Sequence, residues 1–293
     1  MPNSDLFVSA QDGLSLHALE FGSRASVRTP VMCLPGFSRT AEDFRTLAEA
    51  LAREDRRVLA LDSRGRGRSQ FDSDPNNYSL AVELADLISV LTALEAMPAI
   101  LIGSSRGGLL AMLLAAQRPT MLAGALLNDI GPVIETKGLL RIKGYLGKLP
   151  TSRSFAEGAE ILRKLSEDQF PKLIEADWLI AARRTWREDG DALVLTYDPQ
   201  LADAFAAFSP DAAPPPIWEQ FDALAHVPLM VVRGANSDIL SARTLAGMRE
   251  RRRSMESLEV PDQGHTPLLA EPDVIARIAA FVASCDPGPA GGN

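Results

Sequence analysis

Short apolar runs, bounded by turn residues, recur along the chain between stretches with helical periodicity. Five of these runs begin at Val31, Arg57, Ala99, Gly124 and Pro228, and none alternates between apolar and polar residues. A strand that is covered on both faces has this composition, which is typical of parallel sheets between helices. The alternation of strands with helices therefore predicts an α/β fold with a mostly parallel sheet and right-handed crossovers.

The sequence also predicts a hairpin near the N-terminus and two of the helices. Residues 6–9 and 14–19 flank Asp12-Gly13, a dipeptide that favours a tight turn, so we expect an antiparallel hairpin at the N-terminus. Leucines on one face predict a helix at about 79–97, and an apolar stripe after Pro272 predicts the last helix.

The spacing of the apolar runs predicts the domain organisation. The last two begin at residues 124 and 228, which are too far apart for one crossover helix. We therefore predict a core domain of residues 1–131 and 217–286, interrupted by a helical lid of residues 132–216 that ends in three prolines. Residues 287–293 are rich in glycine and proline, and we expect a disordered tail.

Composition limits the partners that such a protein can have. The chain is 46% hydrophobic and 23% charged, which suits a globular domain with a large core. Its net charge of −8 disfavours nucleic acid or an anionic membrane as the partner. The two cysteines, Cys33 and Cys285, match no zinc or disulfide spacing, and three histidines offer few ligands. We expect neither a metal nor another cofactor.

The sequence also bears on where the protein resides. The N-terminus lacks the basic and apolar regions of a signal peptide, and Arg118-Pro119 interrupts the longest apolar region, residues 107–127. We therefore expect a cytoplasmic protein that does not associate with membranes. The sequence leaves its oligomeric state open.

The segment Gly103-Ser104-Ser105-Arg106-Gly107 lies between a predicted strand and a predicted helix. Gly-x-Ser-x-Gly in this context is typical of a nucleophile elbow, a sharp turn that exposes the middle serine. The glycines leave space for the strained turn, and the positive end of the helix dipole favours a developing anion. The pattern predicts Ser105 as a nucleophile; the alternative is a glycine-rich turn without chemistry.

A serine nucleophile needs a histidine base and an acid, which follow it in the order acid, then histidine. His17 precedes the serine, and His226 precedes any suitable later acid, whereas His265 follows an apolar strand near the end. Two acids, Asp129 and Asp238, follow predicted strands. The turn residues around Asp238 favour it, and we expect Asp129 to anchor the start of the lid.

With these residues the chain resembles the α/β-hydrolase family over nearly its whole length, which implies a three-layer fold. Leu34-Pro35-Gly36-Phe37 matches the position of the family's oxyanion loop. Residues 62–69 are similar to a turn in its esterase, dehalogenase and carbon–carbon hydrolase branches. Pro35 stands where the family commonly has histidine. The resemblance implies that the backbone N–H groups of Phe37 and Arg106 form an oxyanion hole.

Several side chains have more than one interpretation. We expect the Arg106 side chain to be structural, with the binding of an acidic substrate as the alternative. Residues 64–68, Arg-Gly-Arg-Gly-Arg, match no phosphate-binding motif and are expected to be structural. Gly36, Trp178 and Trp186 are candidate substrate-binding residues. The alternative for the two tryptophans is that they form the core of the lid.

Together these features predict a serine hydrolase that cleaves a small carboxylic ester or related acyl substrate through an acyl-enzyme on Ser105. His265 acts as the base and Asp238 orients it. Serine at the elbow argues against haloalkane dehalogenase and epoxide hydrolase chemistry, which uses a carboxylate nucleophile. A lactonase, a carbon–carbon bond hydrolase and a ligand-binding protein on a hydrolase scaffold are the alternatives.

Overall fold

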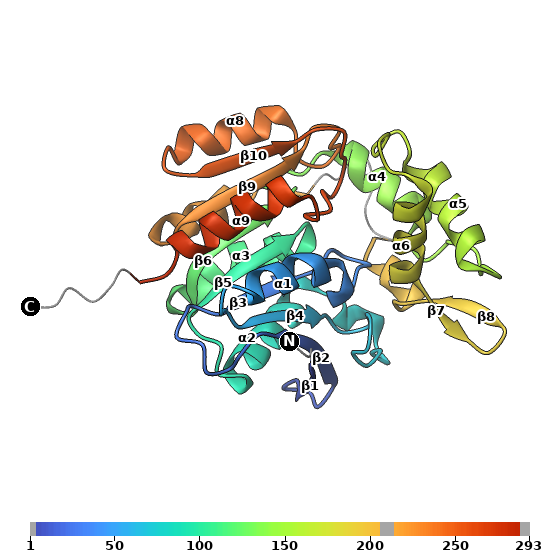
Figure 1. The fold of residues 1–293 in the computed structure, drawn as a ribbon, viewed down its shortest axis with the longest axis horizontal. Helices are drawn as coiled ribbons and strands as arrows, with labels where there is room; N and C mark the ends of the chain where they lie inside the picture. Colours follow the sequence, from blue (N-terminus) through green and yellow to red (C-terminus); the bar gives the residue numbers. More distant parts are fainter. Residues whose placement is uncertain (1–3, 206–213, 288–293) are drawn as a thin grey trace, which may run out of the picture.

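An eight-stranded sheet lies at the centre of the computed structural model, which describes residues 4–205 and 214–287. Its order is β1-β2-β4-β3-β5-β6-β9-β10 (Figure 1). β2 pairs antiparallel with both β1 and β4, and the other neighbours are parallel. The strands are β1 (Ser4–Ser9), β2 (Ser15–Phe21), β3 (Val31–Leu34), β4 (Val58–Asp62), β5 (Ala99–Ser104), β6 (Leu122–Asn128), β9 (Leu229–Gly234) and β10 (Glu256–Val260). The predicted parallel sheet with an N-terminal hairpin is confirmed.

Helices cover both faces of this sheet (Figure 1). On one face lie α1 (Arg45–Ala52) and α9 (Pro272–Ser284). On the other lie α2 (Leu80–Ala93), α3 (Arg106–Gln117), α7 (Trp218–Asp222) and α8 (Ala242–Arg251). Short 3₁₀ helices connect them: η1 (Ala41–Phe44), η2 (Pro75–Asn77), η3 (Pro119–Met121) and η5 (Ala223–His226).

Strand β3 shows why the central strands contain no polar alternation. Met32 and Leu34 point into the core beneath α2 and α3, whereas Val31 and Cys33 point into the core beneath α1 and α9. All four are almost fully buried. Both faces of the strand therefore need apolar side chains, and the whole run is apolar.

A long segment separates β6 from β9, and we call residues 132–216 the inserted segment. It lies beside the edge of the sheet at which the parallel strands end (Figure 1). Its described elements are α4 (Thr136–Tyr145), α5 (Phe155–Ser166), α6 (Glu175–Thr185), β7 (Trp186–Asp189), β8 (Ala192–Leu195) and η4 (Pro199–Phe205). They enclose a small core of their own: Ala159, Phe170, Trp178, Ala182, Trp186 and Leu193.

The antiparallel hairpin β7–β8 is an addition to the mostly helical segment expected from the sequence. Gly190 at its turn has φ +60°, a backbone conformation that suits glycine in a tight hairpin. Part of the predicted lid, residues 206–213, and most of the predicted tail, residues 288–293, lie outside the described residues.

Candidate active site

The predicted elbow is present between β5 and α3. Ser105 has φ +49° and ψ −112°, which is an unusual conformation for a residue with a side chain. A Cβ on Gly107 would lie 2.1 Å from the carbonyl oxygen of Leu34, so only glycine fits there. The tight approach of helix to strand thus explains the spacing of the motif and lifts the Ser105 side chain above the sheet.

Ser105, His265 and Asp129 form a continuous row of hydrogen bonds. The Nε2 atom of His265 lies 2.9 Å from the Oγ of Ser105, and its Nδ1 lies 2.8 Å from Oδ2 of Asp129. Because a carboxylate can only accept, Nδ1 carries the proton in this arrangement and donates it to Asp129. Nε2 is then free to accept the hydroxyl proton of Ser105, as a general base must.

Asp129 directly follows β6 and is completely buried. It has φ +57°, and its side chain reaches the end of β9 and the loop that follows. There the backbone N–H of Gly234 donates to Oδ1 at 2.9 Å, and the hydroxyl of Ser237 donates to Oδ2 at 2.6 Å. These contacts fix the carboxylate against His265.

The prediction that Asp238 orients His265 is wrong in this structure. Both carboxylate oxygens of Asp238 accept from the guanidinium of Arg141 in α4, at 2.7 and 2.9 Å. Burial raises the pKa of Asp238, but the hydrogen bonds from Arg141 outweigh it and leave the pKa below its ordinary value. The expected turn residues after β9 are present, but Gly234 and Ser237 support Asp129 instead.

The other two histidines lie away from this row. His17 is buried on β2 between Asp62 and Asp5. His226 is exposed, and its ring contacts the backbone oxygens of Ala223 and Pro119. Of the three, His265 contacts the elbow serine, as predicted.

The loop after β3 lies against the elbow. An added Cβ on Gly36 would be 3.8 Å from the Cβ of Ser105, so this loop and the serine are in near contact. Phe37 follows in the loop, and Arg106 is the first residue of α3. Of the two positions predicted for an oxyanion hole, Arg106 is next to Ser105 in the chain, and the loop that carries Phe37 lies against Ser105 in the fold.

Buried charges hold both of these positions. Glu83 in α2 accepts from Arg66 at 2.7 Å and from Arg106 at 2.6 Å. Arg66 also donates to the carbonyl oxygen of Phe37, and the guanidinium of Arg106 lies 4.7 Å from the centre of the Phe37 ring. Burial raises the pKa of Glu83, but the two arginines outweigh this and lower it. The Arg106 side chain thus makes structural contacts, an ion pair with buried Glu83 and a stack on the Phe37 ring.

The arginine-rich turn after β4 is structural as well. Arg64 is buried and pairs with Asp86, Asp72 and Asp12. Arg68 reaches the exposed carboxylate of Asp5. These contacts tie the turn to α2 and to the N-terminal hairpin, which agrees with the structural interpretation.

A cavity of about 200 Å³ opens beside Ser105 and His265, between the core and the inserted segment. Of the candidate substrate-binding residues, Gly36 and Trp178 line it, and Trp178 also packs in the core of the inserted segment. Trp186 does not line the cavity, because its ring is buried in the core of the inserted segment and packs on Gly158. Most of the wall is apolar and comes from both parts of the chain: Phe37, Phe44, Ile142, Leu149, Leu162, Phe170, Leu173 and Leu268.

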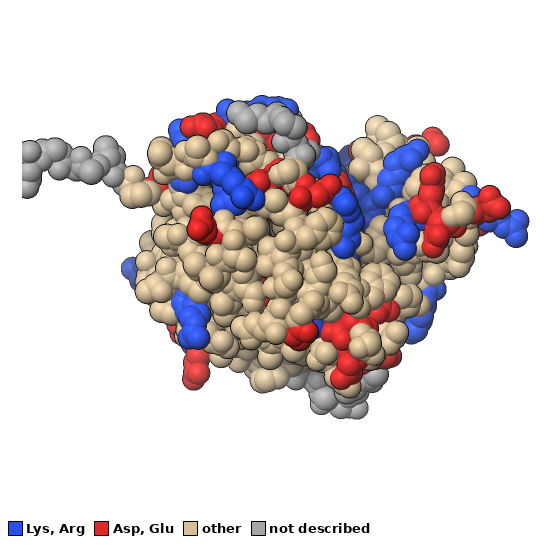
Figure 2. Space-filling view, turned by 90° about the horizontal axis from the view of Figure 1, so that it is seen from below, with Lys and Arg blue, Asp and Glu red and all other residues tan. Residues whose placement is uncertain are grey.

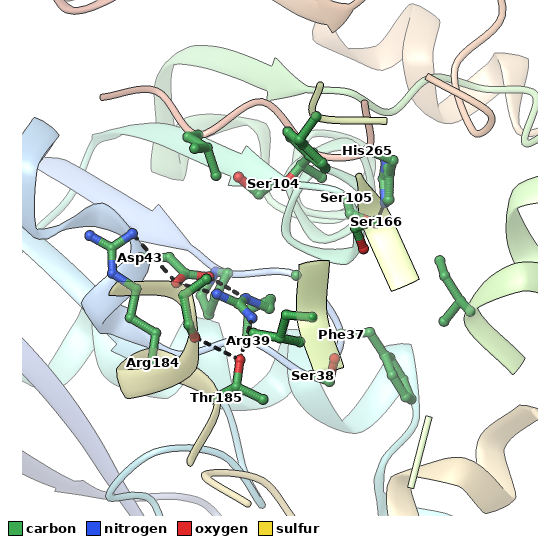
Figure 3. A pocket seen from close by; sticks show the side chains of 18 of the residues that line it. Phe37, Ser38, Arg39, Asp43, Ser104, Ser105, Ser166, Arg184, Thr185 and His265 are labelled. Atoms are coloured by element: carbon green, nitrogen blue, oxygen red, sulfur yellow. Dashed lines mark hydrogen bonds and ion pairs between the residues drawn. The ribbon is translucent and has the colours of Figure 1, made fainter. Parts of the chain in front are cut away.

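Charged side chains that the sequence analysis did not single out also line the cavity. Arg39, Asp43 and Arg184 lie together on one side of it (Figure 3). Arg39 and Asp43 follow β3, and Arg184 is in the last turn of α6. No sequence motif marks them, and Arg184 meets the neighbouring pair Arg39 and Asp43 only when the inserted segment packs on the core.

Within the described ranges, no group of three His, Cys, Asp or Glu side chains is arranged to hold a metal ion. None of the helices described for this chain is long and apolar enough to cross a membrane.

A protein-family model described as the alpha/beta hydrolase family matches residues 31–278, well over half of the chain. The chain belongs to the α/β-hydrolase family. Its relatives include proteins named as a hydrolase and as a lipase, and it is an enzyme of this family.

Three proteins are similar to this hydrolase over most of its length. It is 36% identical to a 3-hydroxybutyrate-oligomer hydrolase of Cupriavidus necator, over 94% of this chain and 96% of the relative. It is 26% identical to the mouse sn-1-specific diacylglycerol lipase ABHD11, over 86% of this chain and 80% of the relative. A solved α/β hydrolase from Novosphingobium aromaticivorans has a TM-score of 0.87 and 38% identity, covering 96% of this chain and 98% of that one.

Proposed function

We propose that this hydrolase cleaves a small carboxylic ester through an acyl-enzyme on Ser105, with His265 as the base and Asp129 as the acid that orients it. The observation that carries the proposal is the hydrogen-bonded row from Asp129 through His265 to Ser105, at 2.8 and 2.9 Å. Ser105 and His265 line a largely apolar cavity, which supports an organic substrate.

Each residue of the row then has a defined step. His265 Nε2 takes the proton of Ser105 while Oγ attacks the ester carbonyl carbon, and the carbonyl oxygen becomes an anion. The N–H groups of Phe37 and Arg106 donate to that oxyanion. The C–O bond to the alcohol breaks, and the alcohol leaves with the proton from His265. Water, deprotonated by His265, then attacks the acyl carbon and releases the acid and free Ser105.

Asp129 has a supporting role in each of these steps. Its carboxylate accepts from Nδ1 and so keeps Nε2 facing Ser105. When His265 holds the extra proton, the buried negative charge beside it stabilises the imidazolium.

The inserted segment is proposed to act as a lid. It supplies Ile142, Leu162, Phe170 and Trp178 to the cavity wall, so it shapes the space in which the acyl or alcohol group binds. The cavity volume of about 200 Å³ suits a short chain. The similarity to the Cupriavidus enzyme makes linear oligoesters of short hydroxy acids the first substrates to test.

The test compares the wild type with Ser105→Ala on p-nitrophenyl butyrate and on a linear 3-hydroxybutyrate dimer. Because loss of the nucleophile removes the acyl-enzyme route, we expect turnover to fall by at least roughly 10⁴-fold. A fluorophosphonate probe should label the wild type on Ser105. Ser104→Ala is the matched control, because Ser104 is the adjacent serine and accepts a hydrogen bond from Asn128 instead of reaching His265.

Two results would overturn the proposal. One is labelling of a residue other than Ser105. The other is a wild type that hydrolyses neither ester, although it is folded by circular dichroism.

A further inference from the structure

One side of the active-site cavity holds two guanidinium groups around a single carboxylate (Figure 3). Arg39 donates from Nε and Nη2 to the two oxygens of Asp43, at 2.6 and 2.8 Å. Its Nη1 donates to the hydroxyl of Thr185 at 3.1 Å. The Asp43 carboxylate is thus occupied by Arg39 in the bidentate geometry that arginine favours.

Arg184 is a second, weaker partner of the Asp43 carboxylate. Its Nη1 lies 3.9 Å from Oδ1 of Asp43, which is close enough for an ion pair but too long for a hydrogen bond. Arg141, the other arginine of the cavity wall, is bound on both sides of its fork by Asp238. Three cationic side chains thus share two carboxylates, and one positive charge is in excess.

The excess charge is accessible from the cavity. We call Arg39, Asp43 and Arg184 the cluster. All three line the cavity, and their side chains are 34%, 23% and 20% exposed. Guanidinium is always charged at neutral pH, so an anion that entered the cavity would meet a site with a net positive charge. The protein as a whole has a net charge of −8, which makes this local excess distinctive.

The cluster is also close to the reacting serine. A Cβ on Gly36 would be 3.4 Å from the Cγ of Arg39 and 3.8 Å from the Cβ of Ser105. The stem of Arg39 and the nucleophile therefore flank the same residue of the oxyanion loop. In a space-filling view, Lys and Arg side chains gather at the hollow between the core and the inserted segment (Figure 2).

We propose that Arg184, together with Arg39, binds a carboxylate on the substrate, so that the preferred substrates are esters that carry a free carboxylate at one end. This inference rests on the proposed esterase function of Ser105. The apolar wall holds the carbon chain, and the pair of arginines holds its charged end while the ester bond lies at the elbow.

A structural role for the same residues is the competing explanation. The hydrogen bond from Arg39 to Thr185 and the ion pair between Arg184 and Asp43 join the core to the inserted segment. Such a role would affect every substrate alike, whereas recognition of a carboxylate would affect only substrates that carry one.

The experiment measures kcat/KM for a linear 3-hydroxybutyrate dimer with a free carboxylate and for the same dimer with a terminal amide. In Arg184→Gln, we expect the preference for the acid over the amide to fall about tenfold, because one charge-assisted contact is lost. In Asp43→Asn, a competing carboxylate is removed, and the same preference should rise. Arg184→Lys, which keeps the charge, should retain part of the preference.

Arg183→Gln is the matched control. Arg183 is the adjacent arginine of α6, but it is exposed and stacks on Phe155, outside the cavity wall. Its removal should leave the preference unchanged.

Equal effects on acid and amide in both Arg184→Gln and Asp43→Asn would overturn the inference and favour the structural role. Turnover of the amide that depends on Ser105 would then still support the esterase. Loss of all Ser105-dependent turnover in the wild type would instead contradict the proposed function itself.

Discussion

At the scale of single residues, the site depends on a carboxylate that is fixed before any substrate binds. Three donors converge on Asp129: the N–H of Gly234, the hydroxyl of Ser237 and Nδ1 of His265. Gly234 ends β9 and Ser237 lies in the loop after it, so this segment and the end of β6 position the base together. Full burial of Asp129 keeps water from competing for these bonds.

We predict that Asp129→Asn lowers kcat by roughly 10³–10⁴-fold on a neutral aryl ester, because an amide in place of the carboxylate favours the wrong imidazole tautomer. Asp238→Asn is the matched comparison, since Asp238 follows the next strand and binds Arg141. We expect it to retain activity within about tenfold.

Thermal unfolding of both variants is the necessary control, because Asp129 also accepts from Gly234 and Ser237. A folded Asp238→Asn enzyme with the larger loss of kcat would mean that His265 uses Asp238 in the working enzyme.

At the scale of elements, the central fold could be read from the sequence because burial on both faces leaves a simple signal. The predicted runs at 31, 99 and 228 begin within one residue of β3, β5 and β9. The elbow could be read for a similar reason, since Gly103 and Gly107 face backbone that excludes a side chain.

The choice of acid could not be read in this way. Asp129 directly follows β6, and Asp238 lies in the loop after β9. Which of them meets His265 depends on side-chain direction and on Arg141, which binds Asp238 from 97 residues earlier in the chain. The cluster of Arg39, Asp43 and Arg184 could not be predicted for the same reason, because Arg184 in α6 is distant in the chain from the neighbouring pair Arg39 and Asp43. Local patterns predict elements, whereas these contacts depend on how the elements pack.

Helix α2 offers a prediction at this scale. Glu83 holds Arg66 and Arg106, which in turn contact Phe37. We expect Glu83→Gln to lower kcat about tenfold with a smaller change in KM, because a small shift of the oxyanion donors weakens the transition state more than substrate binding. Steady-state kinetics with p-nitrophenyl butyrate give kcat and KM for the variant and the wild type.

Asp86→Asn is the control for stability alone. Asp86 lies one turn further along α2, is equally buried and pairs with Arg64, away from Phe37. Both variants should lose roughly 3 kcal/mol of unfolding free energy, as buried pairs do when one partner is changed. Equal losses of kcat in the two variants would show that Glu83 has no special effect on the oxyanion loop.

At the scale of the whole molecule, buried ion pairs join distant parts of the chain. Arg56 is almost fully buried and binds Asp286, so the residues after α9 are held against the core. At the other end of β4, His17 on β2 lies between Asp62 of β4 and Asp5 of β1, at 2.7 and 2.9 Å. This contact fastens the N-terminal hairpin to the rest of the sheet.

The hairpin contact makes stability depend on pH. Burial alone would lower the pKa of His17, but hydrogen bonds to Asp62 and Asp5 outweigh it and raise the pKa above 6.5. Both ring nitrogens face carboxylates, which the protonated ring satisfies because it donates from both. Since the folded pKa lies above the unfolded one, the stabilisation is fully present below pH 6.5 and is lost as the pH rises through the folded value.

Urea denaturation from pH 6 to pH 9 tests this prediction in the wild type and in His17→Asn. The wild type should be the more stable protein at pH 6, and its advantage over the variant should shrink as the pH rises. His226→Asn is the control, because His226 is exposed and contacts backbone oxygens instead of carboxylates. An advantage that stays constant or grows with pH would contradict the protonated state assigned to His17, since a neutral ring can donate to only one of its two carboxylates.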